Sequence, residues 1–298
     1  MKAINVKESK IIIIGCGPSG IAAAIQLKRQ GIDSILVVEK SIPGGLLRNA
    51  NLVENYPGFP DGISGKNLSV LFMKQFEKYG IPFEKDEITD IELSEKKQRY
   101  VLKAISGNYY SCDFLIIATG TEPLKPNLKI PESLKNRIFY EIADLSDTNN
   151  KKICIIGGGD AAFDYALNLS SKVTELKIKI RSDKDKTFDL LRNRVKRDNR
   201  ISVEYRAVVE SVENHDGKPE ITTNYGDFKK TEIFDYLIFA IGRKALKPSY
   251  KFNFEKEIQN DTIYEIGDVK NKIYRQTSIA VANGVETAMR INFKLRGM

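Results

Sequence analysis

Cysteine and histidine are scarce in this sequence, which narrows the chemistry available to it. The three cysteines, Cys16, Cys112 and Cys154, lie far apart, and His215 is the only histidine. This spacing provides no disulfide framework, no metal-ligand cluster and no redox-active C-x-x-C. We expect the cysteines to be small apolar filler and His215 to lie in a solvated hairpin turn with no catalytic role. We also expect no metal site.

Long apolar runs are missing as well. No uncharged apolar stretch approaches the ~20 residues that span a bilayer, and residues 1–8 lack the apolar region of a signal peptide. We therefore expect a cytoplasmic protein with no membrane partner. Of its 298 residues, 42% are hydrophobic, which is enough for two domains of ordinary size, each with its own core.

The charge is unbalanced, with a net +8 and a pI near 9.1. A basic field steers anionic molecules, so a small acidic partner is one interpretation. The densest basic run, residues 192–200, reads R-N-R-V-K-R-D-N-R at the end of an expected helix. Both a solvated helical face and a nucleic-acid patch have this pattern. We favour the helical face and expect no nucleic-acid partner.

The stretch at residues 11–20 organises the rest of the chain. It reads I-I-I-I-G-C-G-P-S-G, which is typical of a buried strand that stops at a glycine cluster and continues as a helix. Gly15, Gly17 and Gly20 permit a tight turn, close approach to a diphosphate and close packing of the helix on the strand. The next expected strand ends at Glu39, where a carboxylate binds a ribose hydroxyl. We predict a dinucleotide site here.

The same pattern recurs in the second half of the chain. Residues 152–162, K-I-C-I-I-G-G-G-D-A-A, indicate a second strand, glycine turn and helix. Both copies close on a buried strand that ends in glycine, at residues 113–120 and 235–242. Between the first turn and its closing strand, residues 64–79 predict a helix whose apolar stripe, including Leu71, lies in the core. The duplication predicts two similar nucleotide-binding domains in an α/β fold.

The tail of the chain has to complete the first domain, because the second copy ends at its closing strand. We expect the first domain to comprise residues 1–118 and 244–298, and the second to comprise residues 119–243. The tail provides a strand that delivers Gly267 and Asp268. A helix follows, and its positive end is expected to face a bound group.

The two copies differ at one informative position. The spacing that leads from Gly20 to Glu39 leads from Ala162 to Arg181 in the second copy. An arginine in place of the acid suits a ribose 2′-phosphate, which favours NADP over NAD, and lysines shortly after it could add charge. Alternatively, Arg181 is a surface residue that follows a strand.

Seven short motifs follow one another along the chain. They are G-C-G-P-S-G at 15–20, P-G-G at 43–45, E-N-Y-P-G at 54–58, A-T-G at 118–120, G-G-G at 157–159, I-G-D at 266–268 and Y-R-Q at 274–276. In this order and spacing the sequence resembles the thioredoxin-reductase family of flavoproteins over essentially its full length. The resemblance implies two Rossmann-like, three-layer ββα domains and a homodimer. It also implies FAD in the domain formed by both chain ends, and NADPH or NADH in the inserted domain.

The resemblance assigns cofactor-binding residues as well. For FAD they are Gly15, Gly17, Pro18, Ser19, Gly20, Glu39, Lys40, Gly45, Leu46, Asn55, Thr119, Gly120, Gly267, Asp268, Arg275, Gln276 and Thr277. For NAD(P)H they are Gly157, Gly159, Asp160, Ala161, Ala162, Arg181 and Gly242. In the family, the Asp268 position meets the ribityl chain, and the Gly45, Asn55, Gln276 and Thr277 positions lie near the flavin ring.

The sequence departs from the family where its chemistry takes place. The C-x-x-C-D of thioredoxin reductases falls without a gap on Y-E-I-A-D, so Tyr140 and Ala143 replace the redox cysteines. Neither side chain supplies the thiolate that disulfide exchange needs. Asp144 retains the family's proton donor, although an ordinary surface aspartate fits the position equally well. Leu46 stands where the family usually has glutamine, and the family's H-R-R reads I-R-S around Arg181.

These observations predict an FAD-dependent oxidoreductase that takes hydride from NAD(P)H and passes the electrons to something other than a protein disulfide. Oxygen, a quinone and a small acidic carrier such as ferredoxin or flavodoxin are compatible acceptors, and the positive charge favours the carrier. One alternative is an enzyme of the ferredoxin–NADP reductase type, which shares the fold and also lacks the C-x-x-C. Another is a non-catalytic flavin-binding sensor or a subunit of a redox complex.

Overall fold

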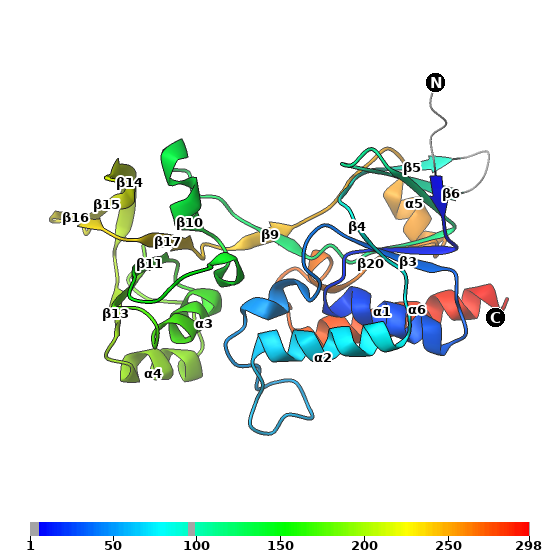
Figure 1. The fold of residues 1–298 in the computed structure, drawn as a ribbon, viewed down its shortest axis with the longest axis horizontal. Coiled ribbons are helices and arrows are strands. Elements are labelled where there is room, and N and C mark those ends of the chain that lie inside the picture. The colour runs from blue at the N-terminus through cyan, green and yellow to red at the C-terminus, as the bar shows by residue number, and fades with distance from the viewer. Residues whose placement is uncertain (1–5, 95–98, 298) are drawn as a thin grey trace. The chain divides into compact units, whose positions relative to one another are not determined.

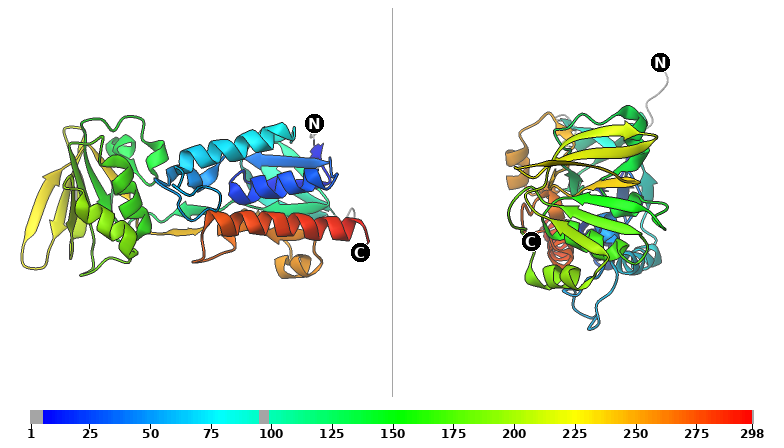
Figure 2. Two further views of the ribbon diagram at one scale, coloured as in Figure 1. Left: turned by 90° about the horizontal axis from the view of Figure 1, so that it is seen from below. Right: turned by 90° about the vertical axis from the view of Figure 1, so that its left-hand side faces the viewer.

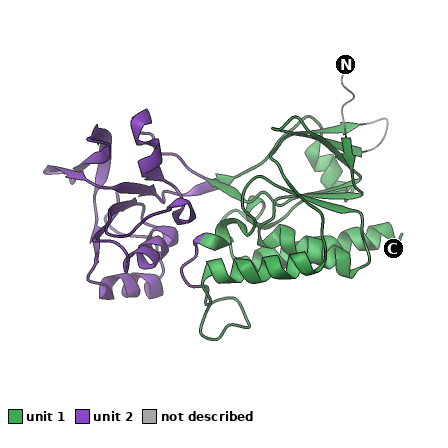
Figure 3. Cartoon of the chain, viewed as in Figure 1, with its two compact units in different colours: residues 1–48, 53–122, 244–298 green, residues 49–52, 123–243 purple. Residues whose placement is uncertain are grey.

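The computed structural model describes residues 6–94 and 99–297, and the chain folds as two compact units. Unit 1 comprises residues 1–48, 53–122 and 244–298, and unit 2 comprises residues 49–52 and 123–243 (Figure 3). The sequence predicts the two main domain boundaries after residues 118 and 243. In the structure, the packing of the chain puts them after residues 122 and 243. Residues 1–5, part of the segment expected to lack a signal peptide, lie outside the described residues.

The central sheet of unit 1 is parallel and leads into the first glycine turn. Its strands lie in the order β20, β8, β2, β3, β4, with the bounds Ile263–Glu265, Phe114–Ile117, Ile11–Ile14, Ile35–Glu39 and Phe83–Lys85. All four pairings are parallel. Strand β2 is central and every one of its four isoleucines is buried, which explains the uninterrupted apolar run in the sequence.

Unit 1 has three layers (Figures 1 and 2). A second sheet has the order β1, β7, β6, β5, β19, with the bounds Val6–Glu8, Tyr109–Cys112, Arg99–Ala104, Ile88–Ser94 and Ser249–Tyr250. The helices are α1 (Pro18–Arg29), α2 (Gly65–Lys78), α5 (Phe254–Gln259) and α6 (Thr277–Leu295). Ile11 and Ile13 of β2 share one core with α1 and α6, whereas Ile12 and Ile14 share another with the second sheet. The central sheet therefore separates two cores.

Unit 2 repeats this plan. Its parallel sheet has the order β10, β17, β11, β12, β13, with the bounds Ile138–Phe139, Tyr236–Phe239, Lys152–Ile156, Glu175–Lys179 and Ile201–Glu204. Helices α3 (Asp160–Leu169) and α4 (Asp189–Arg197) share a core with Ile153 and Ile155, and Cys154 lies in the other core. The second sheet is antiparallel, formed by β14 (Val208–His215), β15 (Lys218–Asn224) and β16 (Lys229–Ile233). The prediction of an α/β fold with two Rossmann-like halves is confirmed.

Short elements complete the fold. Strands β9 (Thr121–Pro123) and β18 (Arg243–Ala245) pair as a two-stranded sheet where the chain passes between the units. The short 3-10 helices are η1 (Gly45–Asn49), η2 (Glu132–Arg137), η3 (Ile142–Asp144) and η4 (Gly267–Val269). None of the helices in residues 6–94 and 99–297 is long and apolar enough to cross a membrane.

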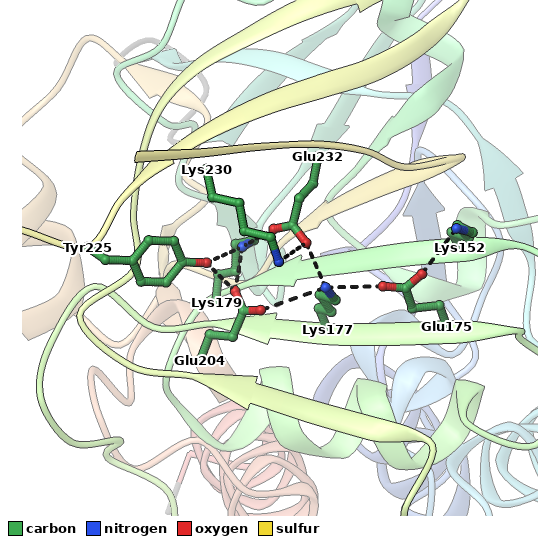
Figure 4. A network of polar contacts seen from close by, with 8 residues as sticks. All are labelled: Lys152, Glu175, Lys177, Lys179, Glu204, Tyr225, Lys230 and Glu232. Carbon is green, nitrogen blue, oxygen red and sulfur yellow. Dashed lines mark hydrogen bonds and ion pairs between the residues drawn. The ribbon is translucent and has the colours of Figure 1, made fainter. Parts of the chain in front are cut away.

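An ion network joins the two sheets of unit 2 (Figure 4). The side chain of Lys179 is completely buried, and its ammonium group lies 2.8 Å from Glu232 Oε2, 2.7 Å from Tyr225 Oη and 2.5 Å from Glu204 Oε2. Burial alone would lower the pKa of Lys179, but hydrogen bonds to these three partners outweigh it and raise the pKa above its usual value. A buried lysine is tolerated here because it is fully paired.

The expected apolar stripe of the helix at residues 64–79 is wrong at one position. Leu68 and Phe76 of α2 are buried as predicted, whereas Leu71 is 44% exposed. A spacing of three residues from Leu68 puts Leu71 at the margin of the buried face, where the helix turns toward solvent.

Candidate functional site

The first glycine turn closes against the end of strand β8. Gly15 has φ +107°, and a Cβ atom there would lie 2.4 Å from the carbonyl oxygen of Ala118. A Cβ atom on Gly20 would lie 2.0 Å from the carbonyl oxygen of Gly15. No other residue fits either position without displacing backbone. The turn therefore brings the start of α1 directly over the end of β2, as the sequence predicts.

The N-terminus of α1 is suited to an anion. Gly17 is the N-cap, Pro18 is the first helical residue, and no described side chain caps the helix. Its first turn contains no acidic residue. A Cβ atom on Gly17 would have only the Cα of Gly45, 3.9 Å away, within 4 Å, so the backbone here is accessible to a ligand. Uncapped N–H groups and the helix dipole together favour a diphosphate.

A pocket of about 230 Å³ opens beside this turn in unit 1. It is lined by Ile14, Gly15, Val38, Glu39, Lys40, Asp86, Glu87, Ile88, Thr89, Thr119, Leu246, Lys247 and Pro248. Of the residues predicted from the sequence, the pocket brings together Gly15, Glu39, Lys40 and Thr119. Its apolar walls suit an adenine ring, and its carboxylate suits a ribose. The pocket and the uncapped helix together fit the adenosine diphosphate part of FAD.

Glu39 is held firmly at the edge of this pocket. It is only 8% exposed, and its Oε2 accepts a 2.7 Å hydrogen bond from the backbone N–H of Cys16. Its Oε1 accepts bonds from the backbone N–H and the hydroxyl of Ser41. A carboxylate has about four acceptor positions, so capacity remains for a ribose hydroxyl. The assignment of Glu39 to the ribose stays a prediction.

Sequence reasoning missed two segments that line the pocket. Residues 86–89 follow β4, and residues 246–248 follow β18. The signal for the first was available, because ligands of parallel sheets bind at the carboxyl ends of the strands and Asp86 directly follows a strand. Nothing in the local sequence indicates that Leu246 lies beside the first glycine turn.

The remaining FAD residues are assembled from distant parts of unit 1. Asn55 Nδ2 donates a 2.8 Å hydrogen bond to Oε1 of Gln276, which is the N-cap of α6. Thr277 begins that helix. A Cβ atom on Gly267 would lie 2.5 Å from Ser19 Oγ, so η4, which includes Asp268, lies against the start of α1.

The other assigned loops approach the same turn. A Cβ atom on Gly45 would lie 3.2 Å from the Cα of Gly17, and Leu46 follows it in η1. The hydroxyl of Thr119 donates to the carbonyl oxygen of Leu246, and the carbonyl oxygen of Gly120 accepts from the Leu246 N–H. These placements agree with one extended ligand, although the role of each residue stays a prediction.

The second glycine turn has the same backbone architecture. A Cβ atom on Gly157 would lie 2.3 Å from the carbonyl oxygen of Ala240, while one on Gly159 would meet no atom within 4 Å. Gly159 is the N-cap of α3, Asp160 is its first residue, and Ala162 is completely buried. This turn therefore also offers an accessible helix N-terminus, but with an acid beside it.

The remaining residues assigned to NAD(P)H come from three segments of unit 2. Arg181 is exposed, in a loop that leads to α4. Gly242 has φ +122°, and a Cβ atom there would lie 3.2 Å from Leu124 Cδ1. Ala161 is exposed in the first turn of α3. Both interpretations of Arg181, as a phosphate ligand and as a surface residue, fit this placement.

The segment at residues 140–144, which the sequence predicts to stand in place of the family's dithiol, is ordered within unit 2. The ring of Tyr140 stacks on Phe239 at 6.0 Å, and burial raises the pKa of Tyr140. The N–H of Ala143 donates a 2.9 Å bond to Oδ1 of Asn49, whose Nδ2 donates a 2.7 Å bond to Glu141 Oε2. Asp144 ends η3 and is exposed. Hydrogen bonds and ring packing hold this segment in place, and its correspondence to the family's dithiol stays a prediction.

The three cysteines are buried in three different hydrophobic cores and form no disulfide. Burial, with a smaller effect of Glu39, raises the pKa of Cys16 to about 12. Burial also raises the pKa values of Cys112 and Cys154 strongly. At neutral pH all three are thiols rather than thiolates, so none is poised for nucleophilic attack. The expectation that they are buried filler is confirmed by their burial.

The other polar candidates are surface features. His215 ends β14 at a hairpin turn and lies 3.4 Å from Glu220. In the basic run, Arg192 pairs with Asp185 and Asp189, and Arg200 pairs with Asp198. No group of three or more potential metal ligands occurs within the described part of the chain.

Comparisons with known proteins agree with this geometry. Residues 9–284 match the family described as pyridine nucleotide-disulphide oxidoreductase. Thioredoxin reductase of Pneumocystis carinii is 28% identical over 93% of both chains, and that of Bacillus subtilis is 28% identical over 94% of this chain and 93% of its own. The crystal structure of T. acidophilum thioredoxin reductase has a TM-score of 0.84 at 21% identity, covering 97% of this chain and 99% of that one.

Proposed function

The chain belongs to the pyridine nucleotide-disulphide oxidoreductase family, whose members use FAD and NADPH, and we propose that it is an NAD(P)H-dependent flavin oxidoreductase with a non-dithiol acceptor. The observation that supports a non-dithiol acceptor is the burial of the cysteine sulfur atoms. All three thiols are buried in separate cores. The resemblance in addition implies that Tyr140 and Ala143 replace the family's redox cysteines. Disulfide exchange needs an accessible thiolate.

FAD, when bound, accepts hydride and releases electrons singly or in pairs. The chain's own residues bind and orient it. The N–H groups at the start of α1 hold the diphosphate, Glu39 holds a ribose, and Asp268 holds the ribityl chain. Gln276 and Thr277 open α6, and the positive end of that helix stabilises negative charge on a group beside it. The bond between Asn55 and Gln276 fixes the orientation of the Gln276 amide.

Unit 2 binds the nicotinamide nucleotide. Its glycine turn at residues 157–159 and the start of α3 receive the diphosphate, and Arg181 receives the 2′-phosphate of NADPH. Asp144 is a candidate proton donor. Its exposed position at the end of η3 allows exchange of a proton with solvent.

The acceptor belongs to one of three classes, oxygen, a quinone or a small acidic electron carrier. The net charge of +8 favours an acidic carrier, because a basic surface raises the rate of encounter with it. An enzyme of the ferredoxin–NADP reductase type is a special case of this proposal. A flavin-binding sensor or subunit is the alternative outside enzymes.

The test is to mix purified protein with NADPH, and separately with NADH, in the absence of oxygen, and to follow the flavin absorbance. Rapid bleaching by either nucleotide supports the oxidoreductase. A flavin that neither nucleotide reduces would favour the sensor or subunit. Adding oxygen, a quinone, ferredoxin or oxidised thioredoxin to the reduced protein then identifies the acceptor, and fast reoxidation by thioredoxin alone would contradict the proposal.

We also propose that the protein is a homodimer that forms through the helical face of unit 1. A groove of about 150 Å³ lies among α1, α2 and α6. On α6, Val281, Val285, Met289 and Phe293 recur every fourth residue, and Met289 and Phe293 are 41% and 49% exposed. A two-fold interface buries the same stripe on both copies. Light scattering should give twice the chain mass for the native protein and the chain mass for Phe293→Glu. A native monomer would refute the dimer.

A further inference from the structure

The loop after β12, residues 181–188, is fixed to the second glycine turn at three points. The N–H of Lys186 donates a 2.7 Å bond to the carbonyl oxygen of Gly158. The hydroxyl of Thr187 donates a 2.9 Å bond to Oδ1 of Asp160, and the N–H of Phe188 donates a 3.2 Å bond to the same oxygen. Thr187 is only 4% exposed, so its hydroxyl depends on this acceptor.

The middle of the loop is anchored from a different direction. Asp185 accepts hydrogen bonds from Arg192 Nε at 3.0 Å, from Tyr205 Oη at 2.9 Å and from the N–H of Thr187 at 3.1 Å. Burial alone would raise the pKa of Asp185, but these bonds outweigh it and lower the pKa. The loop therefore has one conformation that is specified by bonds on both sides.

This loop carries three cations and two acids, Asp183 and Asp185, of which Asp185 is paired with Arg192. Arg181, Lys184 and Lys186 are all exposed within it. The backbone N–H of Lys186 is bonded to Gly158, the central glycine of the triplet, so the loop that carries these cations lies beside the second glycine turn. Their placement depends on the loop, and Asp160 accepts two of the three hydrogen bonds that join the loop to the turn.

Asp160 would otherwise be an unfavourable residue at this place. It is the first residue of α3, where its negative charge opposes a diphosphate at the helix N-terminus. An acid at this position favours the helix dipole whether or not it contacts the loop, so the dipole does not explain the hydrogen bonds to Thr187 and Phe188. Its carboxylate instead accepts two hydrogen bonds from the loop, which spread its charge and direct it toward Thr187 and Phe188.

We propose that Asp160 is a positioning residue for nucleotide specificity, because it holds the cationic loop 181–188 against the glycine turn and so favours a nucleotide with a 2′-phosphate over one without it. This inference rests on the proposed function of unit 2 as a nucleotide-binding unit. It assigns Asp160 no direct contact with the nucleotide.

The test compares Asp160→Ala with Asp160→Asn. Both variants remove the charge from the first turn of α3, so any effect of charge alone is common to them. Only asparagine keeps an oxygen that accepts from Thr187 and Phe188. The matched pair on the other side of the bond is Thr187→Val, which lacks the hydroxyl, and Thr187→Ser, which keeps it.

Two readouts are needed. Without nucleotide, limited trypsin digestion should cleave Asp160→Ala about tenfold faster than the native protein after Arg181, Lys184 or Lys186, with Asp160→Asn close to native. In titrations, the Kd for NADPH should rise about tenfold in Asp160→Ala, equivalent to ~1.4 kcal/mol, while the Kd for NADH changes by less than about twofold. Flavin content controls for folding of unit 1.

The outcomes separate this inference from the proposed function. If the native protein binds neither nucleotide, the proposed function fails, and the trypsin readout still decides whether Asp160 holds the loop. Unchanged cleavage in Asp160→Ala overturns the inference. Equal behaviour of the alanine and asparagine variants, or equal loss of NADPH and NADH affinity, overturns it as well.

Discussion

The two glycine turns have the same backbone architecture but differ in the position of the nearby acidic residue. In both, the first glycine packs against the end of a neighbouring strand. A Cβ atom on Gly15 would lie 2.4 Å from the carbonyl oxygen of Ala118, and one on Gly157 would lie 2.3 Å from that of Ala240. The first turn has its acid, Glu39, at the end of the next strand, and the second has Asp160 inside the helix. In the proposed function, the common scaffold binds a diphosphate and the surrounding charges select the nucleotide.

The units also differ in the interactions that hold their two sheets together. The core between the sheets of unit 1 includes Tyr100, Leu102 and Tyr110, whereas unit 2 places an ion network beside its core. Breaking a buried ion pair on one side leaves an uncompensated charge, which costs more than the pair contributes when intact. Unit 2 is therefore more sensitive to single charge removals than unit 1.

The largest effect is expected for Lys179→Met. It leaves Glu204 and Glu232 without their buried partner, and the free energy of unfolding of unit 2 should fall by about 3–5 kcal/mol. Chemical unfolding followed by circular dichroism measures this. The control is Lys152→Met on the neighbouring strand, whose exposed pair with Glu175 spans 3.3 Å and should contribute less than about 1 kcal/mol. Equal losses in the two variants would contradict the account.

Gly20→Ala should come next. Its Cβ would lie 2.0 Å from the carbonyl oxygen of Gly15, so α1 must shift from β2, at a cost of about 1–3 kcal/mol. Copurified FAD should fall with it. Gly159→Ala, where a Cβ meets nothing within 4 Å, is the matched control in the other turn and should keep native stability. Full FAD occupancy in Gly20→Ala would refute the close packing at the first turn.

Arg181→Glu should have a smaller effect that is confined to the second turn. Replacing the cation by an acid should weaken NADPH about fivefold more than NADH, or ~1 kcal/mol at an exposed site. Arg181→Lys retains the charge and should lie close to native. Kinetic constants for flavin reduction by the two nucleotides provide the measurement, and equal losses for both would leave Arg181 as a surface residue.

The last prediction concerns the stability of unit 2 in acid, through Glu232. Burial alone would raise its pKa, but hydrogen bonds from Lys177, Lys179 and Lys230 lower it from the ordinary 4.5 to about 2. Because the folded-state value is the lower one, its contribution to stability is present above about pH 4.5 and is lost as the pH falls toward 2. Glu232→Gln should lose less stability than the native protein between about pH 5 and about pH 3 in chemical unfolding. Parallel losses would contradict this.

The scaffold of both sites was predictable from the sequence because backbone geometry determines it. The glycine positions, the duplication and the return of the tail to the first domain all follow from spacing. Gly284 illustrates the last point, since a Cβ there would lie 2.3 Å from the carbonyl oxygen of Ser19, so α6 and α1 cross closely.

What the sequence could not predict depends on side chains that meet only in three dimensions. The alternation in E-L-K-I-K predicts an exposed face for β12, yet Lys179 is buried because β16 brings Glu232 over it. The bond between Asp160 and Thr187 depends on the conformation of a loop that has no regular pattern. Leu246 reaches the pocket through strand pairing that no local motif indicates.

We propose that the flavin is the last redox centre within the protein, because no thiol pair follows it. Anaerobic titration of the purified flavoprotein with the nucleotide that reduces it tests this most directly. One hydride equivalent per flavin should complete the bleaching, since FAD takes two electrons and the buried thiols take none. A requirement for two equivalents per flavin would reveal a second two-electron centre and contradict the account.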